Sequence, residues 1–274
     1  MGTWKYPALP AALWLLISLS LLGCEGDEGP AGPPGTPTIY ISGKVAAEPS
    51  MWPYGPPPYP TWATLQVSDL PSIPEVAVNG TALPINYVTG DQISFLEFDL
   101  PVEPGDSVHL SVNYVDADSN PRQAWADILL PEAFSIILPD TAWNLQIPWA
   151  EDLELHWEAS GGADAYWFYF NLYASYWVAG EHQSSFCWLD TTIADTHLTI
   201  PLTLYLPDTS LMDSADGGMG ELKIVAQNGI WQEGELGNIQ GDGDGFFYAR
   251  TQESAEIELL PPAYLANPNA RGSK

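Results

Sequence analysis

The stretch Leu100-Pro-Val-Glu-Pro-Gly-Asp-Ser-Val-His-Leu-Ser-Val-Asn-Tyr114 indicates the fold class of this chain. After its Pro-Gly-Asp turn, apolar residues occupy every second position, namely Val108, Leu110, Val112 and Tyr114. Successive side chains of a β-strand point to opposite faces, so this alternation gives one apolar face and one polar face. The stretch therefore predicts a turn that leads into a half-buried β-strand.

Similar short runs recur along the chain between Gly, Pro, Asn and Asp residues, and no long segment shows the 3.6-residue period of a helix. We therefore predict an all-β fold of two tandem β-sandwiches, with the first at residues 38–133 and the second at residues 134–262. The strands expected in the first half are Ile39–Val45, Trp62–Val67, Glu75–Val78, Ile93–Leu100, Ser107–Val115 and Ala124–Leu130.

Both halves resemble known sandwich families. Leu100–Tyr114 resembles the E–F crossing of bacterial immunoglobulin-like domains. In the second half, Trp157 followed by Ala165-Tyr166 resembles strands B and C of fibronectin type III domains, and Leu222–Gly229 resembles their strand F. The resemblance implies an immunoglobulin-like sandwich followed by a fibronectin III-like one, with strand G at Ser254–Leu260.

The chain departs from the fibronectin pattern in three segments. Gly217–Gly220 lacks the aromatic residue expected there, and we expect Glu181–Trp188 and Ile230–Gly245 to be insertions.

Residues 1–23 have the features of a signal peptide. Lys5 precedes an apolar run from Ala11 to Leu22, which is too short for a permanent membrane-spanning helix. The run ends in Leu21-Leu22-Gly23-Cys24, which resembles the lipobox of bacterial lipoproteins, where cleavage precedes a Cys that carries diacylglycerol. The resemblance implies a lipid on Cys24, and Glu25 in place of Asp favours the outer membrane of the bacterial cell envelope.

Residues 24–37 form the expected tether. Gly26, Gly29, Gly32 and Gly35 recur with a period of three, as in collagen. So few triplets do not hold a trimer without help, which favours an extended spacer over an oligomerisation segment. Residues 263–274 are expected to be a C-terminal tail.

The composition excludes two classes of protein. With 7 Lys and Arg against 35 Asp and Glu, and a formal net charge of −28, the chain cannot form the basic surface that a nucleic acid requires. Hydrophobic residues make up 46% of the chain, which argues against disorder. The charge favours divalent cations as partners.

The sequence contains no nucleophile elbow, P-loop, dinucleotide-binding glycine pattern or zinc-protease motif, so we expect no enzymatic activity. Calcium is the one cofactor that the residues suggest. Two acidic turns place oxygen ligands at alternate positions; the alternative is that they are plain turns or loops. The candidate calcium ligands are Asp116, Asp118 and Asn120 in the first turn, and Asp242 and Asp244 in the second, the Gly-rich stretch Gly241–Gly245.

Aromatic residues supply the candidate ligand-binding surface. Members of the run Tyr166–Phe170 must alternate between the two faces of a strand, so Trp167 and Tyr169 cannot share the core with their neighbours. Exposed rings mark binding surfaces; the alternative is that they pack under the other domain or the insertions. The candidate ligand-binding residues are Trp52, Tyr54, Tyr59, Trp167 and Tyr169.

The sequence as a whole predicts a lipid-anchored cell-envelope protein that presents β-sandwich domains for adhesion, scaffolding or partner binding. The alternative is a carbohydrate-binding module that uses the aromatic residues, with calcium stabilising a loop. Its partners would be the membrane, through the lipid, and a protein or polysaccharide of unknown identity.

Overall fold

The computed structural model describes residues 39–48, 61–139, 144–148, 151–206, 211–229 and 237–260. These residues form β-strands almost throughout and belong to one compact unit, Thr38–Lys274. The all-β prediction is confirmed. Within the described ranges, helix α2 comprises Leu202–Tyr205. The described residues contain no helix that is long and apolar enough to cross a membrane.

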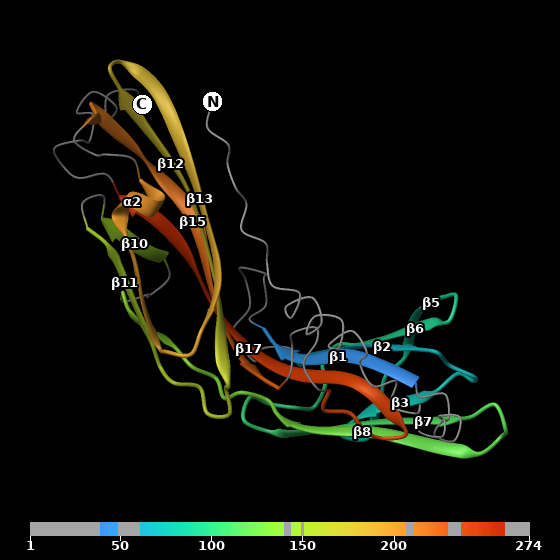
Figure 1. Ribbon diagram of the computed structural model, residues 1–274. Helices are drawn as coiled ribbons and strands as arrows, with labels where there is room; N and C mark the ends of the chain where they lie inside the picture. The colour runs from blue at the N-terminus through green and yellow to red at the C-terminus, as the bar shows by residue number, and fades with distance from the viewer. Residues whose placement is uncertain are drawn as a thin grey trace, which may run out of the picture. The chain divides into compact units, whose positions relative to one another are not determined.

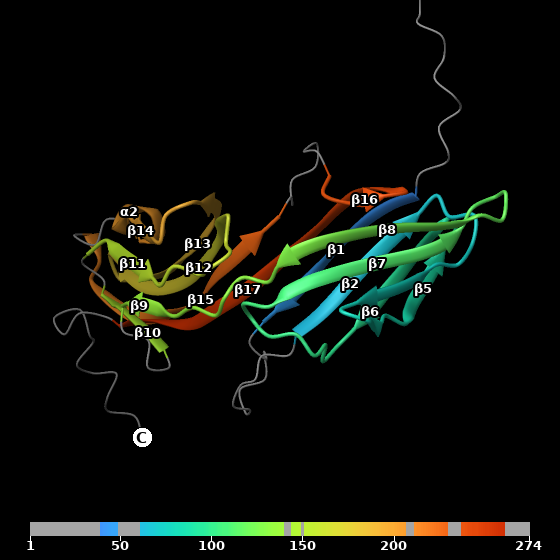
Figure 2. The same ribbon diagram turned by 90° about the horizontal axis from the view of Figure 1, so that it is seen from below.

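The first half consists of two facing sheets whose apolar sides enclose a core (Figure 2). One layer follows the order β1-β2-β6-β5 and the other the order β16-β8-β7-β3-β4. The predicted alternation of β7 is confirmed, because Val108, Leu110, Val112 and Tyr114 are all buried. The strands are β1 (Ile39–Ala47), β2 (Thr61–Ser68), β3 (Glu75–Val78), β4 (Thr81–Ala82), β5 (Ile85–Thr89), β6 (Gln92–Glu97), β7 (Ser107–Val115), β8 (Pro121–Leu129) and β16 (Gln240–Gly241).

The second half has a separate core between a large sheet and a small one. The large layer has the order β13-β12-β15-β17, with β10 also paired to β17, and the small layer has the order β14-β11-β9. The strands are β9 (Ile136–Leu138), β10 (Asn144–Pro148), β11 (Leu153–Trp157), β12 (Ala165–Val178), β13 (Glu181–Ile193), β14 (His197–Ile200), β15 (Ser214–Asn228) and β17 (Gly243–Leu260).

Strand β17 belongs to both halves. Its first part pairs in parallel with β1, and its second part pairs antiparallel with β15 (Figure 1). Phe247 and Ala249 therefore lie in the first core, whereas Ile257 and Leu259 lie in the second. The sequence places all of β17 in the second unit, because the local pattern does not reveal a partner as distant along the chain as β1. The boundary between residues 133 and 134 stays a prediction.

Two hairpin turns depend on left-handed backbone conformations. Asn79 and Gly80 have φ values of 47° and 79°, and they join β3 to β4 in the two-residue turn for which an Asn-Gly pair is typical. Ala179 and Gly180 have φ values of 51° and 80°, and they form the two-residue turn between β12 and β13. The second turn was not expected, because Ala rarely adopts a positive φ.

Two segments that the sequence assigns to an insertion or a loop are in fact strands. Glu181–Trp188 forms most of β13, which pairs with β12 over its whole length. Gly241–Gly245 includes the end of β16 and the start of β17, so the expectation of a loop there is wrong. A Cβ atom on Gly245 would lie 1.8 Å from the carbonyl oxygen of Ile41, which shows that glycine is needed for the close approach of the two strands.

Candidate functional site

Strand β12 separates its aromatic residues between two faces, as the sequence predicts. Tyr166, Phe168 and Phe170 are buried in the second core. Trp167 and Tyr169 point to the opposite face, where both are half-buried. The two rings lie 6.0 Å apart between centroids, with an angle of 40° between their planes.

Polar side chains of β12 itself and of the strands on either side of it contact these two rings. Trp167 donates its indole N–H to Asp190 on β13. Asn171 donates to the Tyr169 hydroxyl at 3.0 Å, and the Lys223 ammonium lies 5.5 Å from the centre of the Tyr169 ring. The two candidate residues are thus fixed on the surface of their own sheet.

The most exposed apolar side chains lie further along the same face. The exposed fractions are 45% for Tyr173, 69% for Phe186, 62% for Trp188 and 72% for Met219. Tyr173 lies opposite Phe186 on one side and Met219 on the other, so the three side chains share one face of the sheet. Exposed apolar patches are candidates for interaction surfaces. We call the following set the aromatic face: Trp167, Tyr169, Tyr173, Trp177, Phe186, Trp188 and Met219.

Sequence reasoning missed Phe186, Trp188 and Met219. The first two were assigned to an insertion, although their spacing of two residues already places them on one face of a strand. Met219 lies between glycines in a segment with no strand-like alternation, and only its pairing with Tyr173 places it on the aromatic face.

A groove of about 920 Å³ borders the aromatic face over β12, β15 and β17. Gly217 on β15 leaves the outer face without a side chain opposite Ser175. Trp177 donates its indole N–H to Asp216, an acidic residue at the groove, at 3.1 Å. The lining combines apolar and acidic side chains, among them Tyr173, Met219, Asp216, Glu221, Glu256 and Glu258.

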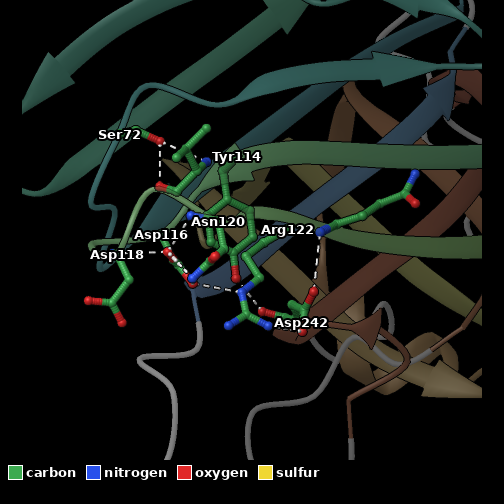
Figure 3. Close-up of polar contacts among 9 residues, drawn as sticks. Ser72, Tyr114, Asp116, Asp118, Asn120, Arg122 and Asp242 are labelled. Atoms are coloured by element: carbon green, nitrogen blue, oxygen red, sulfur yellow. Dashed lines mark hydrogen bonds and ion pairs between the residues drawn. The ribbon is translucent and has the colours of Figure 1, made fainter.

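The two predicted calcium turns come together around Arg122 (Figure 3). Its Nε donates to Asp116 Oδ2 at 2.8 Å, and its Nη1 lies 3.5 Å from Asp242 Oδ1. The Tyr114 hydroxyl donates to the carbonyl oxygen of Asp242 at 2.6 Å. A single arginine of the chain itself thus lies between one carboxylate from each turn and offsets one of their two negative charges.

Asp116 also organises its own turn. Its Oδ1 accepts the backbone N–H groups of Asp118 and Asn120 at 3.0 and 2.8 Å. These backbone hydrogen bonds, that of Asn120 first, and the hydrogen bond from Arg122 hold the pKa of Asp116 below its usual value. Burial raises the pKa of Tyr114, and the nearby negative charge of Asp242 adds to this effect.

Among the remaining candidate calcium ligands, Asn120 turns its amide nitrogen toward Asp116, at 3.3 Å from both carboxylate oxygens. Asp118 and Asn120 are exposed, and Asp244 is exposed and accepts the backbone N–H of Gly245. Across the described ranges, no three His, Cys, Asp or Glu side chains form a group that could hold a metal ion. The calcium site stays a prediction.

Each basic residue in the described ranges has an acidic or aromatic partner. Lys44 lies over the Trp62 ring, and Lys223 pairs with Glu221 at 2.9 Å. Arg122 contacts Asp116, as described above, and Arg250 pairs with Glu48. The described cations are therefore engaged locally, and the acidic surplus of the chain faces solvent or a partner.

Four of the predicted site residues lie outside the described residues, namely Cys24, Trp52, Tyr54 and Tyr59. Cys187 is buried and unpaired, and burial raises the pKa of its thiol. Cys187 packs in the second core as a small apolar residue.

No known protein family matches the chain, and no curated protein matches it. Among solved structures, the fibronectin(III)-like modules of Clostridium thermocellum CbhA match with 11% identity, covering 81% of this chain and 93% of that one, at a TM-score of 0.28. The IG1+IG2 structure of DIP-gamma matches with 10% identity, covering 82% of this chain and 97% of that one, at a TM-score of 0.20. Likenesses this distant carry no argument about function, which depends on the site itself.

Proposed function

We propose that this protein is a non-enzymatic, lipid-anchored protein of the bacterial cell envelope that binds a partner through the aromatic face of its second half. The observation that carries the proposal is the exposure of Tyr173, Phe186, Trp188 and Met219 on a single face of the sheet. Water-exposed rings and a thioether at adjacent positions release free energy when a partner covers them. Adhesion and scaffolding are the roles that such a surface would serve on an anchored protein.

The anchor is proposed on the resemblance of Leu21–Cys24 to a lipobox. Acyl chains on Cys24 would keep the protein at the membrane, because each buried methylene contributes about 0.8 kcal/mol and several chains act together. Labelling with radioactive palmitate tests this. The wild-type protein should incorporate the label and Cys24→Ala should not, and equal labelling of the two would exclude the anchor.

Site-specific photo-crosslinking of the full chain in living cells tests the binding surface. A benzoylphenylalanine replacing Trp188 should form a covalent adduct with a partner. The matched control carries the same group in place of Ile73, which is 68% exposed but lies in the first half. The same adducts from both positions, or none from position 188, would exclude the aromatic face as the binding surface.

Polysaccharide binding is the second candidate function. It is favoured by the position of Trp167 and Tyr169 beside hydrogen-bonding groups of Asp190 and Asn171, since sugar sites combine flat apolar rings with polar groups at their edges. A glycan array probed with wild-type protein and with Trp167→Ala tests it. Signals that the substitution abolishes would support this function, and signals at background level would exclude it.

A further inference from the structure

Strand β13 forms an edge of the large sheet. It pairs with β12 over residues Glu181–Ile193, and the strand order of the described residues ends with it. An edge strand presents backbone N–H and C=O groups that are free to pair with another chain. Proteins usually protect such an edge with lysine, proline or a bulge, and β13 contains no lysine or proline and pairs with β12 without a shift of register.

Two neighbouring outward side chains of β13 are large and apolar, namely Phe186 and Trp188, between polar residues at positions 184 and 190. Phe186 lies opposite Tyr173 and Trp188 lies opposite Asn171, and both β13 rings are more than half exposed. A strand added beside β13 would place every second side chain on the same face, next to these two rings. The rings would then be covered on the side that β12 leaves open.

The charge of the surroundings indicates the chemistry of that strand. Asp190 follows two residues after Trp188 on the same side of β13, and its exposed carboxylate continues the row. Glu221, Glu256 and Glu258 line the groove on the same sheet. The basic side chains on this part of the sheet already have acidic partners, because Lys223 pairs with Glu221 and His182 lies 3.4 Å from Asp216. A second copy of this chain would bring a further formal charge of −28, whereas a basic segment would be attracted.

We propose that an extended, basic segment of a partner protein adds to the open edge of β13 as a further strand. Apolar side chains of the segment lie beside Phe186 and Trp188, and a lysine or arginine lies beside Asp190. The inference rests on the proposed binding function and names the class of partner. Main-chain hydrogen bonds supply affinity in this mode of recognition, and alternate side chains supply specificity.

A synthetic peptide tests the proposal against the full mature chain in detergent. The peptide Lys-Thr-Val-Thr-Val-Thr-Lys puts its valines on the face of Phe186 and Trp188 and its lysines at both ends of that row, in either direction. Fluorescence anisotropy should show saturable binding that weakens as salt is added. The same peptide with glutamate in place of lysine should bind at least about tenfold more weakly, a difference of about 1.4 kcal/mol.

Two further controls separate strand addition from simple adhesion to apolar residues. Methylating the backbone nitrogens of the central threonine and of one valine blocks a donor toward β13 in either strand direction while keeping both valines and both lysines, and should abolish binding. Trp188→Ser should weaken binding at least about tenfold, as expected for a central aromatic contact, whereas Ile73→Ser should leave it unchanged.

Three outcomes would overturn the proposal. The first is equal binding of the lysine, glutamate and N-methylated peptides. The second is dimerisation of the mature chain that Phe186→Ser abolishes, since a second copy would then occupy the edge. The third is absence of peptide binding by a chain that still crosslinks through position 188, in which case the binding function stands and the partner is of another class, such as a polysaccharide.

Discussion

Phe186 on β13 lies directly opposite Tyr173 on β12, and both rings are exposed although each strand also contributes side chains to the core. This pair shows how one hairpin serves two purposes. The inward residues of β12 stabilise the second half, and the outward residues of both strands form the surface that we propose binds a partner. Substitutions on the two faces should therefore have separable effects.

Substitutions of the two faces of the hairpin should differ in their cost to stability. Phe170 is completely buried, so Phe170→Ala should lower the free energy of unfolding by about 3–5 kcal/mol. Phe186→Ser removes an exposed ring and should change it by less than about 0.5 kcal/mol. Urea denaturation monitored by tryptophan fluorescence measures both values. Similar losses for the two variants would show that Phe186 is covered in solution.

Arg122→Gln should destabilise the first half. The variant leaves the carboxylates of Asp116 and Asp242 without the cation that joins them, so the melting temperature should fall by several degrees. Millimolar Ca²⁺ should restore part of the loss, because the two freed carboxylates then face each other without a counter-charge.

For the wild-type chain, the predicted calcium site requires heat of binding in calorimetry and a higher melting temperature with Ca²⁺. A chain that shows neither has no such site.

Acid should weaken the turn at Asp116 in a defined window. Hydrogen bonds from its own turn and from Arg122 lower the pKa of Asp116 below 3.8 in the folded chain, whereas the unfolded chain keeps the ordinary value. The stabilisation is therefore complete above about pH 4 to 5 and is lost as the pH falls through the lowered pKa. The difference in unfolding free energy between wild type and Asp116→Asn should shrink across that acid range. A difference that does not change with pH would contradict the assignment.

Alkali should strengthen the sheet around Lys44. Burial, and then the charge of Arg250, lower the pKa of Lys44 to about 8, whereas unfolded lysine keeps a value near 10.5. The folded chain thus binds this proton less tightly, and stability should rise as the pH increases from about 8 to about 10.5. Lys44→Met has no amine that titrates. The free energy of unfolding of the wild type should therefore rise relative to that of the variant between about pH 8 and about pH 10.5. Parallel pH profiles would show that Lys44 titrates normally.

Two glycines with positive φ should respond differently to alanine. Gly180 has open space around it, so Gly180→Ala should cost about 1 kcal/mol for the strained backbone alone. Gly245→Ala adds a collision with the Ile41 carbonyl and should cost about 3 kcal/mol or more. Thermal unfolding of both variants measures the difference. Equal costs would mean that β1 and β17 are further apart than described.

Much of the fold could be predicted because strand alternation is a local property. The strands Glu75–Val78 and Ser107–Val115 have the predicted bounds, and the alternation in β12 correctly places Trp167 and Tyr169 outside the core. Strand β13 was missed because its polar residues on both faces resemble a loop. The start of β17 was missed because its glycines and aspartates signal a turn, and only the approach of β1 explains them.

The sequence by itself determined the all-β class, the two apolar cores and the strong negative charge, because periodicity and composition depend on residues close together in the chain. Tertiary structure decided which side chains meet. Antiparallel pairing of β12 with β13 placed Phe186 beside Tyr173, and the pairing of β16 with β8 brought Asp242 to Arg122. Pairing register between distant segments follows from the packing of whole sheets, so no local pattern contains it.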